Sequence, residues 1–148
     1  MLRRKQFAVA ALAMLNVAFL LWMPARVAAA KSETFVSYEI AAVRIDGNPP
    51  PEWNLYHLAH GKFNEVVVLE WGKRIIRLDE RLKEAREIKA ESVTRKKGSL
   101  SWTVDDSAST VLPTSDWIYR DVGNVQRLHL SLTAESHEIE IDLPHFAK

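Results

Sequence analysis

The segment from Leu128 to Leu143 alternates strictly between apolar and polar residues in two runs. Successive side chains of a β-strand point to opposite faces, so each run places its apolar residues on one face. The first run carries Leu128, Leu130 and Leu132, and the second carries Ile139, Ile141 and Leu143. The alternation predicts an antiparallel hairpin with one face in a core and one face in water.

The register of this hairpin depends on where its turn lies. With Glu135 and Ser136 as the turn, Leu132 is expected to face Ile139. In the same register Leu130 faces Ile141 and His129 faces Asp142. Ile141 is then a core residue, whereas Glu140 beside it lies on the wet face.

Further strands are expected along the chain, separated by glycine-containing turns. Residues 63–71 include the uninterrupted apolar run Val66–Leu69, which is typical of a strand buried on both faces. Turns are expected at Asp46–Pro49, at Gly72-Lys73, at Lys96–Gly98 and at Gly123-Asn124. Other predicted strands begin at Phe35 and cover 74–79, 100–104 and 117–122, with a polar loop at 105–115.

Two segments carry helical signals. Residues 51–60 are predicted to form a short helix, because Pro51 and Glu52 suit a first helical turn and Gly61 suits the position after the last. Residues 80–91 consist of good helix formers, and Asp79 could cap a helix there. Strands flank this segment on both sides, which favours a strand over 86–93 instead. The expected fold is mainly β, a small antiparallel sandwich or barrel with a short helix near 51–60 and a possible second helix at 80–91.

The N-terminal 30 residues have the three parts of a secretory signal. A basic start at Arg3–Lys5 precedes an apolar run, Phe7–Met23, and Ala28 and Ala30 form an A-x-A cleavage pattern with Lys31 as the first mature residue. We therefore expect a signal helix at 1–30 followed by a single β-rich domain at 31–148, exported to the periplasm or the extracellular space. The alternative is an inner-membrane anchor at 7–23 with the domain facing outward, in which case this segment is the only membrane contact.

Composition narrows the classes of function. Four of the 20 basic residues lie within 1–30, which leaves 16 against 19 acidic residues and a net charge of −3 for residues 31–148. An acidic domain gives no support for nucleic-acid binding. The chain has no cysteine, which excludes disulfides, thiolate catalysis and cysteine metal ligands. No nucleotide-binding glycine loop and no nucleophile-elbow motif is present, so no cofactor is expected.

Two groups of residues are weighed as sites. His57 and His60 are three residues apart and would share a metal on a helix, but no third ligand stands at the required spacing. The wet face of the last hairpin collects His129, Thr133, Glu138, Glu140 and Asp142. Alternating charge is common on solvated strands, so we expect neither group to be a catalytic or metal site.

Six aromatic residues are expected to lie mostly in the core: Trp53, Tyr56, Trp71, Trp102, Trp117 and Tyr119. Two or three of them should be buried, and Trp53, which follows three prolines, should be exposed. The remaining expectation for function is a non-enzymatic binding module in the cell envelope or secreted, with a protein or a carbohydrate as its partner. The alternative is a small hydrolase or metal-dependent enzyme whose histidines and carboxylates are assembled by the fold.

Overall fold

The computed structural model describes residues 31–62, 64–104 and 108–145, and the expected signal helix lies outside them. The chain divides into two compact units, Glu33–Trp102 with Asp106–Lys148 and Met1–Ser32 with Thr103–Asp105. The architecture below concerns the first unit. Over the residues described, no helix has the length and apolar character needed to cross a membrane.

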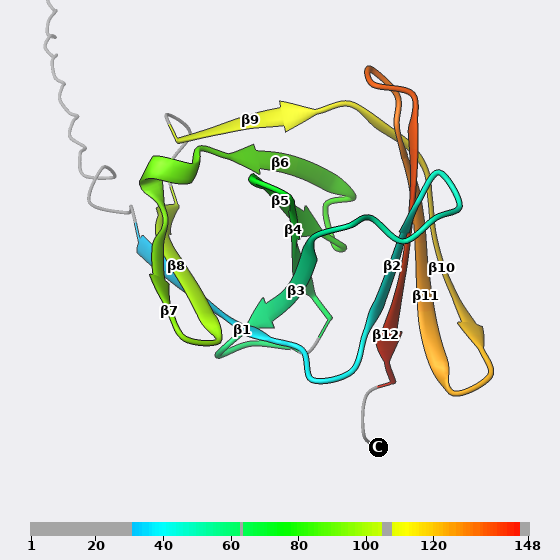
Figure 1. The fold of residues 1–148 in the computed structure, drawn as a ribbon, viewed down its shortest axis with the longest axis horizontal. Helices are drawn as coiled ribbons and strands as arrows, with labels where there is room; N and C mark the ends of the chain where they lie inside the picture. The colour runs from blue at the N-terminus through cyan, green and yellow to red at the C-terminus, as the bar shows by residue number, and fades with distance from the viewer. Residues whose placement is uncertain (1–30, 63, 105–107, 146–148) are drawn as a thin grey trace, which may run out of the picture. The chain divides into compact units, whose positions relative to one another are not determined.

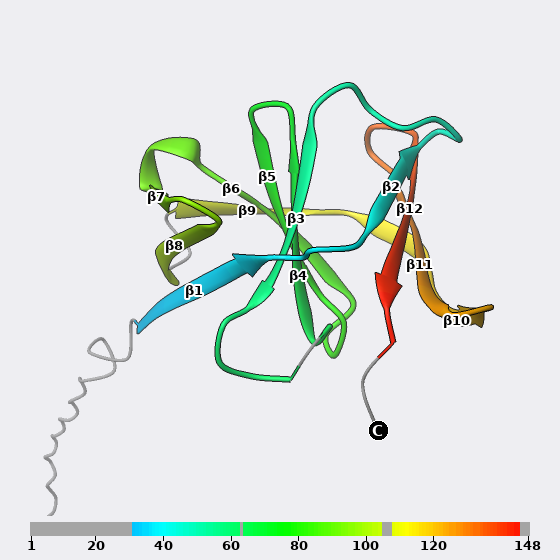
Figure 2. The same cartoon turned by 60° about the horizontal axis from the view of Figure 1, so that its bottom comes forward.

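The prediction of a mainly β, antiparallel fold is confirmed, and the curled sheets form a half-barrel (Figures 1 and 2). One sheet has the order β7-β8-β1-β3-β4-β5-β6-β9 and the other the order β10-β11-β12-β2. The elements are β1 (Lys31–Ser37), β2 (Ala42–Ile45), β3 (Trp53–Leu58), β4 (Val66–Trp71), β5 (Arg74–Asp79), β6 (Glu84–Ile88), the 3₁₀ turn η2 (Ala90–Ser92), β7 (Thr94–Lys96), β8 (Ser99–Val104), β9 (Ser109–Leu112), β10 (Thr114–Val122), β11 (Val125–Leu132) and β12 (His137–Pro144).

Strands β3, β4 and β5 contribute side chains to a core on each face of their sheet. One face packs against the apolar face of β11, β12 and β2 in a core that includes Leu55, Leu69, Leu130 and Ile141. The other face lines the half-barrel in a second core with Phe35 of β1, Ile88 of β6, and Leu100 and Trp102 of β8. Because every residue of Val66–Leu69 meets a core, the run needs no polar alternation, as the sequence predicted.

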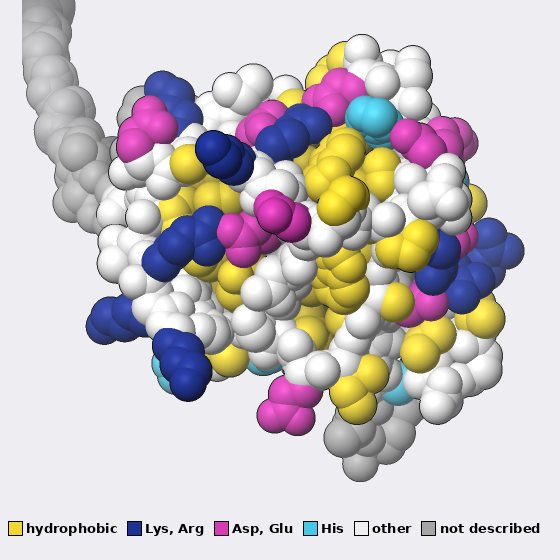
Figure 3. All heavy atoms as spheres, in the orientation of Figure 1, with side chains coloured by type: hydrophobic (Ala, Val, Ile, Leu, Met, Phe, Trp, Pro, Cys, Tyr) yellow, Lys and Arg dark blue, Asp and Glu magenta, His cyan; other side chains and the backbone are white. Residues whose placement is uncertain are grey.

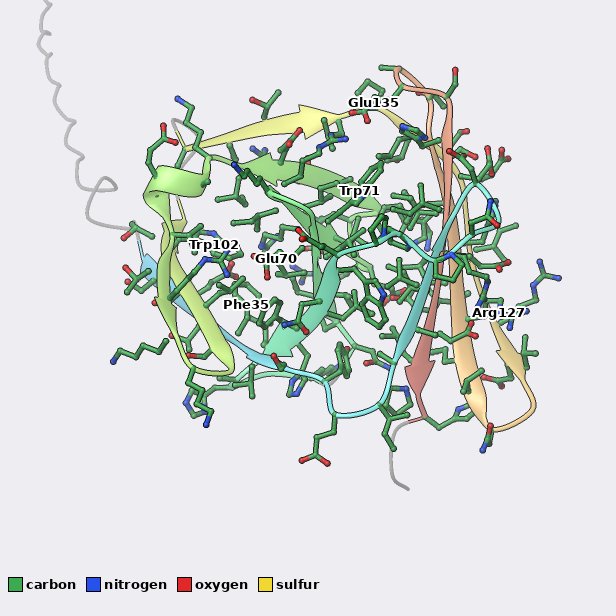
Figure 4. All side chains as sticks on the ribbon, viewed as in Figure 1. Phe35, Glu70, Trp71, Trp102, Arg127 and Glu135 are labelled. Atoms are coloured by element: carbon green, nitrogen blue, oxygen red, sulfur yellow. The ribbon has the colours of Figure 1, made fainter. Side chains whose placement is uncertain are left out.

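The half-barrel encloses aromatic and charged side chains together. Phe35 and Trp102 stack with ring centroids 4.5 Å apart, and Figure 4 shows them side by side within the curve. Arg77 is only 14% exposed and forms ion pairs with Glu33, at 2.7 Å, and with Asp79, at 3.4 Å. The charges inside the curve are therefore neutralised by partners on neighbouring strands, which such burial requires.

A set of polar contacts joins the two sheets. Arg74 of β5 binds Glu87 of β6 at 2.9 Å and Glu135 of the β11–β12 turn at 2.8 Å, and its guanidinium lies over the Trp71 ring. This guanidinium holds the pKa of Glu135 below its usual range. Trp71 also meets the ring of His137 edge-on, at 5.1 Å. Figure 4 labels Trp71 and Glu135, and Figure 3 shows acidic and basic side chains lying next to one another on the same side of the molecule.

The last hairpin has the predicted faces but not the predicted register. Leu130 pairs with Ile139, Leu128 with Ile141 and His129 with Glu140, two residues away from the expected partners. Four residues, 133–136, form the turn instead of the two that were expected, and Ser136 adopts a left-handed φ of 57° that closes it. A slip of two residues leaves every side chain on the same face, so apolar alternation cannot detect it.

The predicted helix at 51–60 is wrong, since Trp53–Leu58 is strand β3. Strand β3 pairs with β1 on one side and with β4 on the other, and it buries Leu55 and Tyr56 on opposite faces. Helix signals at the ends of so short a segment favour it only weakly, and two strand partners outweigh them.

The strand interpretation of residues 80–91 is confirmed, although its limits differ from those expected. Strand β6 covers Glu84–Ile88, and the 3₁₀ turn η2 follows where the strand was predicted to continue. Asp79 does not cap a helix: its carboxylate accepts a hydrogen bond from the Leu82 amide at 3.0 Å in the turn before β6. The predicted loop at 105–115 is also interrupted, because Ser109–Leu112 forms β9 beside β6.

Candidate functional site

A hollow of about 260 Å³ lies where the ends of several strands meet. It is formed by four separate segments: the turn before β4, the turn after β5, and the neighbouring strands β10 and β11. We call it the Asn64 pocket. Its lining residues are Lys62, Asn64, Glu65, Glu80, Arg81, Tyr119 and Gln126.

Asn64 is the organising residue of this pocket. It is 4% exposed, and its backbone has a left-handed φ of 64°, a conformation that asparagine tolerates better than most residues. The Tyr38 hydroxyl donates to Asn64 Oδ1. Asn64 Nδ2 donates to the Pro144 carbonyl at 3.0 Å and to Gln126 Oε1 at 3.1 Å. The buried amide is thus satisfied, and its orientation is determined by its partners.

The orientation of Asn64 determines that of Gln126. Because Gln126 Oε1 accepts from Asn64, the Gln126 Nε2 group is turned away from that contact. Among the described residues Nε2 has no hydrogen-bond partner, and Gln126 lines the pocket. The network therefore presents an oriented N–H donor at the pocket wall.

Two tyrosines keep their protons in this region. Burial raises the pKa of Tyr38 well above its usual range, with a further rise from Tyr119. Burial also raises the pKa of Tyr119, and the nearby Glu80 and Asp79 carboxylates add to this. Both hydroxyls are hence neutral at physiological pH, so Tyr119 can donate one hydrogen bond and accept others at the pocket wall.

Charged groups of both signs surround the hollow. Glu65 and Glu80 are half-buried, whereas Lys62 and Arg81 are exposed. Across residues 31–62, 64–104 and 108–145, none of these four takes part in an ion pair. The pocket thus combines acceptors, donors and a half-buried aromatic ring, which suits a small polar ligand.

Charged side chains without an ion-pair partner, such as Arg81, are uncommon among the arginines of the described residues. Six of the eight arginines in the described part of the chain are paired with carboxylates, the exceptions being Arg81 and Arg120. The paired ones are Arg44, Arg74, Arg77, Arg86, Arg95 and Arg127.

The structure does not bring His57 and His60 together on a helix. His57 lies in β3, where Nδ1 is 2.9 Å from the Leu58 carbonyl oxygen and the ring contacts Tyr38. His60 is exposed in the turn that follows. In the part of the chain that the structure describes, no three His, Asp or Glu side chains are grouped closely enough to hold a metal ion.

The polar face of the last hairpin is a network of ion pairs. Asp142 accepts from Arg127 at 2.7 Å and from Arg44 at 3.2 Å, and these cations hold the pKa of its carboxyl below the usual range. Glu140 binds Arg44 at 2.7 Å, and Glu138 binds His129 at 2.8 Å. Carboxylates occupied in this way stabilise strand pairing, which accounts for them without a site.

The other residues singled out in the sequence have different outcomes. Ala28 and Ala30 of the expected cleavage pattern lie outside the described residues, and Lys31 is the first residue of β1. Trp53 is 37% exposed, as expected, while Tyr56 and Trp102 are buried in the half-barrel. The expectation of two or three buried aromatic residues is confirmed.

A second hollow, more apolar, lies beside Ile40, which is 76% exposed. Ile40 and Pro144 line two adjoining depressions, of about 370 and 450 Å³. This surface offers contact area but few oriented polar groups. The Asn64 pocket, with its defined donors and acceptors, is the better candidate for specific recognition.

Comparison with protein families, with characterised proteins and with solved structures gives no match. The site therefore rests on geometry alone. Sequence reasoning missed it because its residues come from four segments, each with ordinary local composition. One local signal existed: Asn64 lies two residues before the buried strand β4, and asparagine is typical of left-handed turn positions.

Proposed function

We propose that this chain is an exported, non-enzymatic binding module that holds a carbohydrate in the Asn64 pocket. The supporting observation is the fixed network in which Tyr38 orients Asn64 and Asn64 orients Gln126. A pocket organised before the ligand arrives avoids the entropy cost of ordering side chains on binding.

The chemistry of the pocket matches a sugar ring. Each sugar hydroxyl donates one hydrogen bond and accepts others, so it needs both kinds of partner. Glu65 and Glu80 supply acceptors, and Gln126 and Arg81 supply donors. The half-buried Tyr119 ring adds an apolar wall of the kind that packs against the carbon-bound hydrogens of a sugar.

Binding is tested by isothermal titration of the mature protein with the neutral hexoses glucose, galactose and mannose and with their 2-amino counterparts. For a ligand of this size we expect a Kd of about 1 mM for the preferred sugar. Gln126→Leu should weaken binding about tenfold, since it removes one donor and one support of Asn64.

The matched control is Asn124→Leu, on the exposed β10–β11 turn, which does not line the Asn64 pocket. No heat with any of the six sugars, measured well above 1 mM, would contradict the proposal.

Export is supported by the basic, apolar and small-residue pattern of residues 1–30. We expect N-terminal sequencing of the protein from its native host to begin at Lys31. A protein that begins at Met1 and is recovered with the membrane would instead indicate an anchor at residues 7–23. A protein that begins at Met1 in the cytoplasmic fraction would contradict export.

A further inference from the structure

The two glutamates of the Asn64 pocket stand opposite each other across a strand pair. In the β4–β5 hairpin Val66 pairs with Asp79, and the Glu80 amide donates to the Glu65 carbonyl at 3.0 Å. The ladder thus continues by one step, which places Glu65 and Glu80 directly across from one another. Like charges in this position destabilise a sheet, and they are usually separated or neutralised.

No cation of the described chain neutralises this pair. Neither glutamate forms an ion pair among the described residues, although other half-buried carboxylates such as Glu33, Glu87 and Asp142 do. Lys62 and Arg81 line the same hollow, but their exposed side chains are screened by solvent. The half-buried carboxylates are screened less, so a positive charge is favoured near them.

We infer that the Asn64 pocket selects a sugar that carries an ammonium group, which Glu65 and Glu80 bind together. This inference rests on the proposed function and specifies its ligand. An ammonium group offers three donors, enough to reach both carboxylates and still contact a third acceptor. Charge-assisted hydrogen bonds of this kind are roughly twice as strong as neutral ones, and they also relieve the repulsion between the glutamates.

The test compares sugars that share one ring and differ only in the group at carbon 2, which is an amine, a hydroxyl or an acetamide. Glucosamine, glucose and N-acetylglucosamine are titrated into the mature protein in mildly acidic buffer, where the sugar amine is protonated. The galactose and mannose series are treated in the same way. In the preferred series we expect the amino sugar to bind about tenfold more tightly than both neutral forms, which share its ring but lack its charge.

The variants Glu65→Gln and Glu80→Gln locate the selectivity. Each should reduce the preference for the amino sugar to about threefold or less, and the double variant should abolish it while the neutral sugar still binds. Glu91→Gln, on the exposed η2 turn, is the matched control and should leave the preference unchanged. Melting curves of all variants confirm that they are folded.

The outcomes separate the two proposals. Equal affinity for the amino and neutral sugars overturns the inference and leaves the proposed carbohydrate site standing. A preference for the amino sugar that survives in the double variant also overturns it, because the ammonium then binds elsewhere. Failure of every sugar to bind overturns both.

Discussion

The Ile141→Asp variant is expected not to fold. Ile141 is fully buried in the core between the two sheets, where it lies between β11 and β2 and pairs with Leu128 and Val43. Replacing it removes about 2–5 kcal/mol of apolar burial and places a carboxylate where no partner can reach it. That total approaches or exceeds the roughly 5–15 kcal/mol stability of an ordinary domain.

Circular dichroism and the dispersion of amide resonances measure the outcome directly. Wild-type protein should show a cooperative melt, whereas the variant should show none. Glu140→Gln serves as the control, since Glu140 neighbours Ile141 but points to the other face, toward Arg44. Loss of that half-exposed ion pair should cost about 1 kcal/mol or less. An unchanged melt for Ile141→Asp would show that the hairpin is not packed as described.

The second large effect is expected for Arg77→Met. This guanidinium is bound by Glu33 and Asp79 inside the half-barrel, and removing it leaves two carboxylates with little access to water. Breaking a buried pair by deleting one partner costs about 3–5 kcal/mol, far more than the loss of a surface pair. In a domain of this size that corresponds to a fall in Tm of roughly 10–20 °C.

Arg120→Met is the matched control for this prediction. Arg120 lies on the exposed side of β10 and forms no ion pair with any described residue. Its replacement should change Tm by only about 1–2 °C, the usual effect of a surface substitution. Similar Tm values for the two variants would indicate that the charges inside the half-barrel are hydrated.

The features that could be predicted from the sequence are those determined by residues close together in the chain. The alternation in 128–143 defined a strand face, and Val66–Leu69 defined a strand buried on both sides. The hairpin register could not be read in this way, because a slip of two residues preserves every face. Residues 53–58 became a strand only because β1 and β4 lie on either side of them, a fact that no local pattern contains.

The candidate site could not be predicted from the sequence for a related reason. Asn64, Glu80, Tyr119 and Gln126 are far apart in the sequence and unremarkable in isolation. Their chemistry appears only when β4, β5, β10 and β11 end near one hollow. The residues that did attract attention in the sequence, His57 and the carboxylates of the last hairpin, are accounted for by strand pairing and ion pairs.

The central claim is that ligand binds at the Asn64 pocket, and a nuclear magnetic resonance titration tests it most directly. Backbone amide resonances of ¹⁵N-labelled protein comprising residues 31–148 are followed as glucosamine is added to several times its Kd. Shifts should be largest at Lys62, Glu65, Glu80, Tyr119 and Gln126, the residues that line the hollow. Shifts centred on the apolar surface around Ile40 and Pro144, with the pocket unchanged, would contradict the account.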